Sequence, residues 1–311
     1  MILLWGTMDD EPMAMAHAAL VRAGADAFFL DHRTIFTADV EYAFDSERGA
    51  RCSVTSDGAT IDMARVNVAY VRGSNQYDYD EVRDLSKDSA LAMRGARFEA
   101  QLIGWLDSSE TLTINRSGPS ATNNSKPYQL TSIRQAGFFV PETLVSNDAV
   151  AVRVFLGENP DAVYKSVSGV RSIVRPVDER HREFLDDVRW CPTLFQRVVR
   201  GTNYRAHVLG DDVLAVRIES DQLDYRYGSS TITVAELPAE IEQRCRRLSA
   251  TLGLHFSGID LIRTPQDQWY CLEVNPSPAY SYFEIGSGQP ISAAIARFMM
   301  DADRLIKKTR R

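Results

Sequence analysis

The chain has 311 residues, of which 44% are apolar and 25% are charged, and this length is sufficient for two domains or for one domain of closely joined lobes. Such a composition excludes disordered, collagen-like and coiled-coil proteins. Lys and Arg total 35 against 42 Asp and Glu, and the net charge of -7 provides no basic surface for a nucleic acid or an anionic membrane, so we expect neither as a partner.

The N-terminal segment does not resemble a signal peptide. Residues 1–5 are apolar but have no basic flank, and they lead directly into the acidic residues 9–11. No segment approaches the roughly eighteen apolar residues that a spanning helix requires. Four cysteines lie far apart without a CxxC pair, which argues against a zinc ribbon and a disulfide framework. We therefore expect a cytoplasmic protein whose cysteines are reduced and mostly buried: Cys52, Cys191, Cys245 and Cys271.

Short apolar strands alternate with helices at the start of the chain. Strands are expected at residues 2–5 and 27–30 with a helix at 12–23 between them, an order typical of a parallel α/β unit. Asp57-Gly58 favours a hairpin turn, because glycine accepts a positive φ. We expect this first domain to span residues 1–115. Its other expected elements are hairpin strands at 51–55 and 60–62, a buried strand at 66–72 and a long helix over 91–106.

Residues 116–125 mark the expected domain boundary. They read RSGPSATNNS, a composition that favours turns. The second domain, residues 116–311, then has a small central α+β lobe at about 126–192 and a C-terminal antiparallel-sheet lobe at about 193–311. Expected helices are 126–136, 148–156, 238–252 and 291–306, and expected strands are 143–145, 162–165, 194–199, 204–209, 213–219, 258–263 and 269–275.

The last expected hairpin carries the strongest chemical signal. Glu273 and Asn275 are two residues apart on one strand and point to the same face, and an antiparallel partner strand can place Asp260 beside them. Two carboxylates and an amide oxygen are ligands that suit Mg²⁺. The same residues would equally serve as a polar residue near a turn, a solvated strand residue and a cap before Pro276. The pattern alone therefore leaves both interpretations open.

Two lysines stand where they could bind phosphate. Lys126 follows the linker, and Lys165 ends an apolar strand directly before Ser-Val-Ser-Gly, a small-residue loop that can fold over a phosphate chain. A lone lysine is more often a solvated surface residue, although the apolar residues 162–164 indicate that Lys165 follows a strand entering a core. The sequence contains neither a P-loop nor a GxGxxG motif, so those nucleotide-binding classes lack their signatures.

Together these segments resemble the ATP-grasp superfamily, and more closely its RimK-like branch and the graspetide (microviridin-type) peptide ligases. The resemblance covers about residues 116–311, and its most specific elements are Gly258-Ile-Asp-Leu-Ile and Leu272-Glu-Val-Asn-Pro-Ser-Pro. It implies an ATP-grasp fold with an N-terminal parallel α/β (pre-ATP-grasp) lobe, and ATP and Mg²⁺ as cofactors. The implied metal ligands are Asp260, Glu273 and Asn275, and the implied nucleotide-binding residues are Lys126, Lys165, Gln196, Arg197, Val198 and Asn203.

Three arginines are implied as groups that hold the phosphate or the acyl carboxylate. Arg205 lies in a stretch beginning at Asn203 that is similar to the family's D-I-R-x-x-V-x-G, although Asn replaces the acidic residue. Arg226 lies in Asp224-Tyr-Arg, which resembles a D-[FWY]-R element, and Arg217 is a weaker candidate.

The loop after Lys165 departs from the family pattern. Where the family usually has several glycines, this chain keeps only Gly169 before Arg171, a residue that can supply charge there. The first domain shows only short, generic similarity to the pre-ATP-grasp region of graspetide ligases, and we expect Arg72 to be a structural residue at a strand end.

The resemblance implies an ATP-dependent carboxylate ligase that forms an acylphosphate and joins the acyl group to an amine or a hydroxyl, releasing ADP. A peptide is the implied substrate, with side-chain ester or amide formation and a precursor peptide as partner. Two alternatives stay open: a RimK-like ligase that joins an amino acid to a small molecule or a protein terminus, and a nucleotide-binding module without catalysis. Dimers are common in the superfamily, so a homodimer is compatible with the resemblance, although no segment marks an interface.

Overall fold

The computed structural model describes residues 1–47, 49–73, 75–167, 174–220 and 230–310. Packing divides the chain into two compact units. The first comprises Met1–Ser117, Ala279–Ser281 and the residues from Pro290 onward, and the second comprises Gly118–Pro278 and Tyr282–Gln289. The sequence-based division assigned the C-terminal helix to the second domain, whereas its packing assigns it to the first unit.

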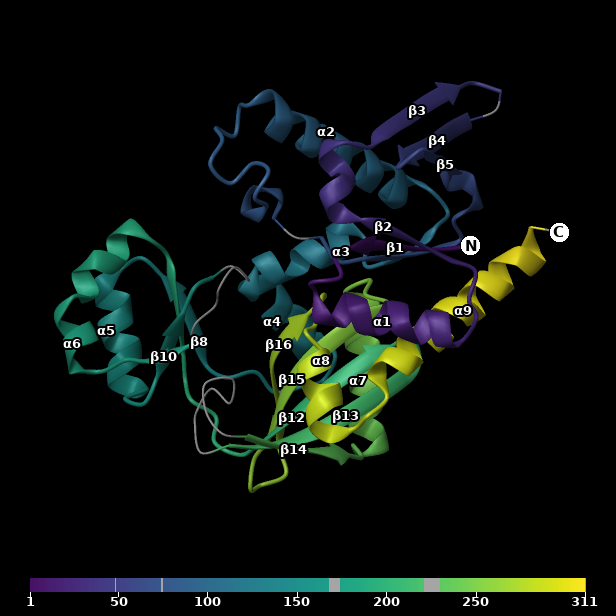
Figure 1. Ribbon diagram of the computed structural model, residues 1–311. Coiled ribbons are helices and arrows are strands. Elements are labelled where there is room, and N and C mark those ends of the chain that lie inside the picture. Colours follow the sequence, from purple (N-terminus) through teal and green to yellow (C-terminus); the bar gives the residue numbers. More distant parts are fainter. Residues whose placement is uncertain (48, 74, 168–173, 221–229, 311) are drawn as a thin grey trace. The chain divides into compact units, whose positions relative to one another are not determined.

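The first unit is built on strands β1 (Ile2–Gly6), β2 (Ala27–Asp31), β6 (Val68–Val71) and β7 (Leu112–Ile114) and on helices α1 (Glu11–Arg22), α2 (Ala90–Ser108) and α9 (Ile291–Thr309). In the order β2-β1-β6-β7 the strands form a sheet in which all neighbours are parallel, and Figure 1 labels β1 and β2 side by side. The parallel α/β unit expected from the sequence is thereby confirmed. Strand β7 was not expected, because three residues are too few to show a pattern.

A second, antiparallel sheet of the first unit consists of β3 (Asp39–Asp45), β4 (Gly49–Ser56) and β5 (Ala59–Asp62). The β4–β5 turn is the expected one: Asp57 and Gly58 have φ of 50° and 77°. Strand β3 was missed because all of its residues are exposed or half-buried and it lacks an apolar run.

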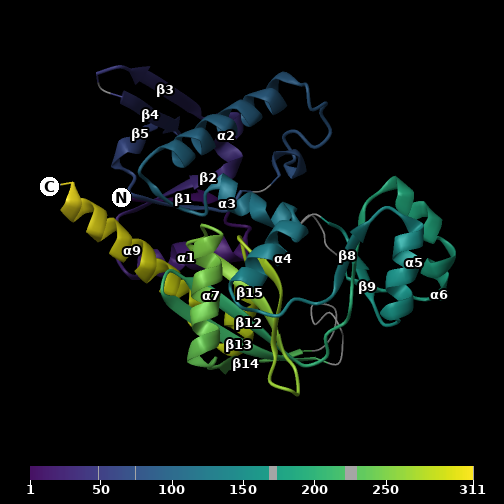
Figure 2. The same cartoon turned by 180° about the vertical axis from the view of Figure 1, so that it is seen from behind.

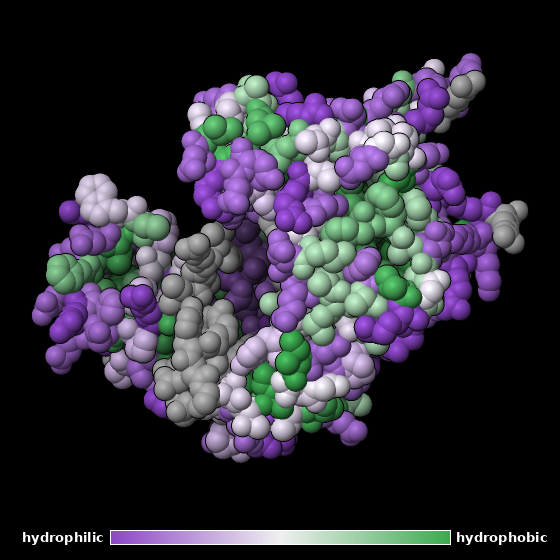
Figure 3. Space-filling view, viewed as in Figure 1, coloured by the Kyte–Doolittle hydropathy of each residue, from purple (hydrophilic) through white to green (hydrophobic). Residues whose placement is uncertain are grey.

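Helix α1 shows how local sequence fixes an element. The Asp10 carboxylate accepts a hydrogen bond from the Met13 N–H at 3.1 Å, and Pro12 occupies the first turn, where its missing N–H is not needed. Buried Met13, Ala16 and Leu20 follow the helical period and face the sheet. The outward side of α1 is only weakly apolar, as the pale green surface over this helix indicates in Figure 3.

Helix α9 belongs to the first unit because a buried carboxylate anchors it there. Asp303 accepts hydrogen bonds from the Met1 ammonium at 2.8 Å and from the Asn67 amide at 2.7 Å. Lys307, one turn further along α9, forms an ion pair with the same carboxylate at 2.8 Å. Burial by itself would raise the pKa of Asp303, but these partners, led by Lys307, hold its pKa below the ordinary value.

The second unit begins with a short helical segment instead of the expected linker of turns. Residues Ser117–Ala121 form α3 and Thr122–Asn124 form a 3₁₀ turn. Pro119 is compatible with this because the first turn of a helix does not use its N–H groups. The prediction of an irregular linker was therefore wrong over these residues.

An antiparallel sheet in the order β10-β9-β11-β8 follows, and it forms the central α+β lobe. The expected strand at 194–199 is observed as Thr193–Gln196, and just beyond it the Arg197 N–H donates to the Glu142 carbonyl at 2.9 Å. The elements of the lobe are β8 (Thr143–Ser146), α5 (Ala149–Glu158), β9 (Val163–Lys165), β10 (Arg175–Pro176), α6 (Glu179–Glu183) and β11 (Thr193–Gln196).

The third part of the fold is a five-stranded antiparallel sheet, which we call the large sheet. Its strands are β12 (Thr202–Leu209), β13 (Asp212–Ser220), β14 (Ser230–Ala235), β15 (Phe256–Arg263) and β16 (Trp269–Asn275), in the order β14-β13-β12-β15-β16. Helix α7 (Ala239–Thr251) lies across one face, as Figure 2 shows, and buries Ile241, Cys245 and Leu248 against it. Two further helices of the second unit are α4 (Lys126–Gln135) and α8 (Ser281–Ser287).

The fold class expected from the sequence is confirmed: a parallel α/β part, a small α+β lobe and an antiparallel sheet. Cys52, Cys245 and Cys271 are buried, Cys191 is exposed, and each of them is a free thiol. Among the described residues, no helix combines the length and the apolar character needed to cross a membrane.

The anchoring of α9 predicts a pH-dependent stability. Asp303→Asn keeps the shape but removes the charge, so we expect it to lower the free energy of unfolding at pH 7 by about 1–3 kcal/mol. The folded-state pKa of Asp303 lies below the ordinary 3.8. The contribution is therefore present above about pH 5 and disappears as the pH falls through the folded-state pKa.

Urea unfolding at pH 7 and at about pH 3 checks this, with Asp301→Asn as the matched control. Asp301 lies on the same helix and forms an exposed ion pair with Arg304, so its loss should change stability by less than about 1 kcal/mol. A difference between wild type and Asp303→Asn that persists undiminished at low pH would contradict the assignment.

Candidate functional site

The register of the large sheet brings the predicted metal ligands and Arg205 to one face. Arg205 of β12 lies opposite Asp260 of β15, and Asp260 lies opposite Glu273 of β16. Directly opposed residues of an antiparallel pair share a face, and so do residues two apart on one strand. Asn203 and Asn275 therefore lie on this face too. We call it the site face.

A bulge in β16 adds a further residue to the site face. The pairing shifts between Asp260 and Leu261, so that Leu261 lies opposite Cys271 and Leu272 is the extra residue. Cys271 points into the core beneath α7, whereas Leu272 lines a crevice with the two predicted lysines. Leu272 and Glu273 are neighbours in sequence, yet both contribute to the site.

Lys126 and Glu273 form an ion pair in which the lysine is buried and the carboxylate is half-buried. Helix α4 begins at Lys126, whose side chain is 3% exposed. Its Nζ atom donates to Asn123 Oδ1 at 2.8 Å and to Glu273 Oε1. A buried ammonium group requires such partners, because an unpaired charge in the interior costs several kcal/mol. The lysine that the family resemblance singled out thus lies against a predicted metal ligand.

Glu273 is ionised in this environment. Burial by itself would raise the pKa of its carboxyl group. Nearby cations outweigh burial and hold the pKa below its ordinary value: Lys126, Lys165 and Arg205. An acceptor-only carboxylate is the state that a metal ion requires.

Arg205 and Asp260 form a second ion pair beside the first. Arg205 is buried, and its Nη1 atom donates to Asp260 Oδ1 at 2.7 Å. The guanidinium also lies over the ring of Phe283 from α8, 5.4 Å from its centroid. The site face therefore carries two carboxylates, each held by its own cation.

His207 lies on the same face, two residues beyond Arg205. Its side chain is fully buried, and neither ring nitrogen has a hydrogen-bond partner among the described residues. Burial, together with the charge of Arg205, lowers the pKa of His207 well below its ordinary value. The imidazole is therefore neutral and acts here as an apolar ring.

The two lysines line one narrow crevice in the second unit, which as it stands has no room for a water molecule. Its walls combine apolar side chains with the two buried ammonium groups. The lining residues are Lys126, Gln129, Leu130, Lys165, Leu194, Gln196 and Leu272.

Gln196 and Arg197 are partly committed to structural contacts. The Gln196 side chain donates to Thr143 Oγ1 at 2.9 Å, and the Arg197 N–H donates a hydrogen bond to the Glu142 carbonyl. A backbone contact to adenine at this position would therefore come from the Arg197 carbonyl or from Val198, which is half-buried just beyond β11.

The donor set on the site face fits Mg²⁺. Asp260 and Glu273 offer carboxylate oxygens, and Asn275 offers an amide oxygen that accepts from the Ser277 N–H at 2.9 Å. Hard oxygen donors of this kind are those that Mg²⁺ prefers. No group of three or more His, Cys, Asp or Glu side chains forms a further candidate metal site in the part of the chain that the structure describes.

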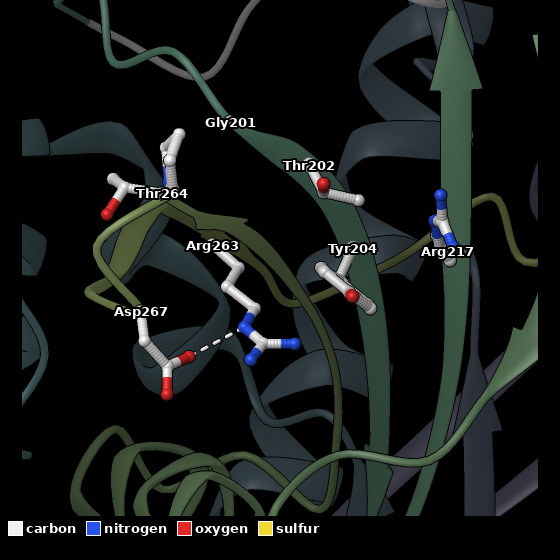
Figure 4. Close-up of a pocket in the computed structure, with 8 residues that line it drawn as sticks. Gly201, Thr202, Tyr204, Arg217, Arg263, Thr264 and Asp267 are labelled. Carbon is white, nitrogen blue, oxygen red and sulfur yellow. Dashed lines mark hydrogen bonds and ion pairs between the residues drawn. The ribbon is translucent and has the colours of Figure 1, made fainter.

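The structure does not bring Arg217 together with the other predicted residues. It lies opposite Tyr204, which points away from the site face, and it forms an ion pair with Glu219. Figure 4 shows Arg217 and Tyr204 beside Arg263, whose Nε atom donates to Asp267 at 2.6 Å. These residues line a polar pocket of about 330 Å³ that also includes Gly201, Thr202, Thr264 and Pro265. Arg226, Gly169 and Arg171 lie outside the described residues.

Gln129 is a residue that the sequence interpretation missed. Its side chain is buried, donates to the Val274 carbonyl at 2.7 Å and accepts from the Val274 N–H at 3.1 Å. It thereby fixes the backbone between Glu273 and Asn275 to α4. The available signal was its spacing: Gln129 is one helical turn after Lys126 and so lies on the same side of the helix.

Comparisons with known proteins identify the family and the fold of the chain. The ATP-grasp domain family matches residues 124–280, slightly more than half of the chain. A probable alpha-L-glutamate ligase of Shewanella amazonensis is 29% identical over 110 residues, which cover 34% of this chain and 36% of that protein. The ATP-grasp ligase PsnB, complexed with a minimal precursor, has a TM-score of 0.81 at 25% identity, covering 97% of this chain and 98% of PsnB. The macrocyclase MdnC of Microcystis aeruginosa, bound with precursor peptide MdnA, has a TM-score of 0.81 at 24% identity, covering 97% and 100%.

The chain therefore belongs to the ATP-grasp domain family. The family resemblance identified from the motifs is confirmed. The alignments with curated relatives span only between about a third and a half of those proteins.

The Gln129 contact predicts a stability effect. Gln129→Leu removes both hydrogen bonds and leaves the Val274 N–H and carbonyl buried without partners, so we expect the free energy of unfolding to fall by about 2–4 kcal/mol. Urea unfolding measures it, with Gln135→Leu, at an exposed position of the same helix, as control. Equal stability of the two variants would show that the contact does not hold β16.

Proposed function

We propose that the protein is an ATP-dependent ligase that activates a carboxylate as an acylphosphate and joins it to an amine or a hydroxyl of a peptide. One observation carries this proposal: the site face holds an ionised Glu273 beside Asp260, with buried lysines around them. This arrangement has the parts that phosphoryl transfer requires, oxygen ligands for a metal ion and fixed positive charge around the phosphates. Arg205 supplies a further cation beside them.

The reaction proceeds in two steps. An oxygen of the substrate carboxylate attacks the γ-phosphorus of ATP, the bond from that phosphorus to the β,γ-bridging oxygen breaks, and ADP leaves. The amine or hydroxyl then attacks the acyl carbon, phosphate leaves, and the nucleophile loses its proton. Carboxylate activation is needed because hydroxide or oxide is a far poorer leaving group than phosphate.

The residues of the site act mainly by position and charge. Lys126 and Lys165 place positive charge beside the crevice, where it would offset the negative charge of the phosphates. Asp260, Glu273 and Asn275 would hold Mg²⁺, which when bound neutralises phosphate charge. The predicted roles of Asn203 and Arg205 fit their place on the same face, and Arg205 would orient a phosphate or a carboxylate.

The comparisons support a peptide substrate and both cofactors. PsnB has been solved with a minimal precursor, Mg and ADP, and this chain matches it along nearly its whole length with 26% identity. A RiPP-associated ATP-grasp ligase of Chryseobacterium gregarium, solved with ADP and a leader and core peptide, has a TM-score of 0.83. We carry over to this chain a precursor peptide as partner and ester or amide formation on its side chains. A cytoplasmic location belongs to the same proposal.

A second candidate is a ligase that adds an amino acid to a small molecule or a protein terminus. The sequence similarity to probable alpha-L-glutamate ligases favours it, and the site chemistry would be the same. The two candidates differ in the acceptor, so the choice of substrate pool distinguishes them.

The test is an ADP and AMP assay of the purified protein with Mg²⁺, ATP and either acidic peptides or pooled amino acids, with hydroxylamine present to trap an acylphosphate. We expect ADP and a hydroxamate. Glu273→Ala should lower turnover on the order of 100-fold or more, because a proposed metal ligand and its charge are lost.

Glu219→Ala is the matched control. Glu219 is an exposed carboxylate of β13 that pairs with Arg217 away from the site face, so its loss should leave turnover within about 2-fold of wild type. Formation of AMP instead of ADP would overturn the acylphosphate route. A Glu273→Ala variant as active as wild type would overturn the site.

A further inference from the structure

We propose that Gly258 and Phe283 are positioning residues that fix the Arg205 guanidinium against Asp260. The expected effect on turnover rests on the proposed function, whereas the position of Arg205 rests only on the contacts described below. Neither residue has a polar side-chain group that could bind the metal ion or the nucleotide. They act through Arg205.

Gly258 leaves the space in which the Arg205 side chain lies. A Cβ atom built at Gly258 would be 2.0 Å from Arg205 Nη2, 2.5 Å from Cζ and 2.7 Å from Nε. Real Cβ contacts are not this short, so any other residue at position 258 must displace the guanidinium. The displaced atoms are the end of a flexible side chain, so the main chain need not move.

The backbone gives no separate reason for glycine at this position. Gly258 is not among the glycines with positive φ. It lies inside β15, paired with His207 on one side and with Asn275 on the other. Glycine within a central strand weakens it and marks a close approach of other atoms. Here the approaching group is Arg205.

Phe283 supports the guanidinium from another side. Its ring centroid lies 5.4 Å from Arg205 Cζ, within the range of a cation–π contact. The neutral ring of His207 packs edge-on against Phe283 at 5.2 Å, and Phe256 lies 6.2 Å from His207. The Arg205 side chain therefore lies between the ring of Phe283 and strand β15 at Gly258, where no side chain projects. Its Nη1 atom is 2.7 Å from Asp260 Oδ1.

The consequence is a cation whose position is fixed before substrate binds. A guanidinium that is already oriented needs no reorganisation when negative charge develops beside it, which is the condition for effective electrostatic catalysis. Loss of either support should therefore lower turnover through Arg205, without removing any group that binds ATP.

The geometry is tested by a crystal structure of Gly258→Ala. We expect an unchanged main chain and loss of the contact from Arg205 to Asp260. An Arg205 guanidinium still within hydrogen-bond distance of Asp260 would overturn the proposal. Should the variant be unstable, Gly258→Ala combined with Arg205→Ala must recover the thermal midpoint of Arg205→Ala alone, because the colliding atoms are gone; failure to recover would likewise overturn it.

The catalytic consequence is tested by a double-mutant cycle on turnover. We expect Gly258→Ala and Arg205→Ala each to lower kcat by about 10- to 100-fold and the double variant to be no worse than Arg205→Ala. Phe283→Leu should lower kcat by a smaller factor, whereas Phe283→Tyr, which keeps the ring face, should retain it. Additive losses in the cycle would mean that Gly258 does not act through Arg205.

Gly104→Ala is the matched control for the glycine substitution. Gly104 is exposed on α2, and a Cβ atom there would meet nothing within 4 Å, so turnover and stability should not fall. The ligase function and the positioning of Arg205 are tested separately. Absence of ligase turnover in the wild type would contradict the proposed function. The crystal structure of Gly258→Ala would still test whether Gly258 positions Arg205.

Discussion

Charge neutralisation on strand β16 is the constraint on which the site depends. Glu273 is a carboxylate in a mostly buried position, and an unpaired ion there would cost several kcal/mol. Helix α4 supplies the compensating cation, Lys126, whose Nζ atom donates to Glu273. One turn later in the same helix, Gln129 holds the Val274 backbone through two hydrogen bonds. The cation and the strand that carries the anion are thus fixed by the same helix. Their relative position is set by the fold before any ligand arrives.

The large sheet extends this arrangement to a second pair. Arg205 and Asp260 lie opposite each other on neighbouring strands, next to Glu273, so two ion pairs lie side by side, with the charge of Lys165 also close to Glu273. In the proposed function this group would receive a metal ion and a polyphosphate together, because each carboxylate already has a cation fixed beside it. On the opposite face of the sheet, Arg217 and Arg263 form ion pairs with other carboxylates and lie apart from these two pairs.

Much of the site follows from local sequence rules, and the rest depends on long-range pairing. Alternation along a strand is local, so it predicted that Glu273 and Asn275 share a face. The bulge that turns Leu272 toward the crevice cannot be deduced from alternation, because it depends on how β16 pairs with β15. For the same reason sequence alone does not reveal that Arg217 lies on the face opposite Arg205. The contacts of Gln129 with β16 and of Asp303 with Asn67 join residues far apart in the chain, so no local sequence pattern predicts them.

This group of charges, in the function we propose, supports activation of a carboxylate by ATP. The most direct measurement follows ¹⁸O from a peptide substrate labelled in its carboxylate groups, with mass spectrometry of the phosphate products. An acylphosphate route transfers one carboxylate oxygen to inorganic phosphate, so the account predicts ¹⁸O in phosphate, in proportion to product. Label found in AMP, or product formed with unlabelled phosphate, would contradict it.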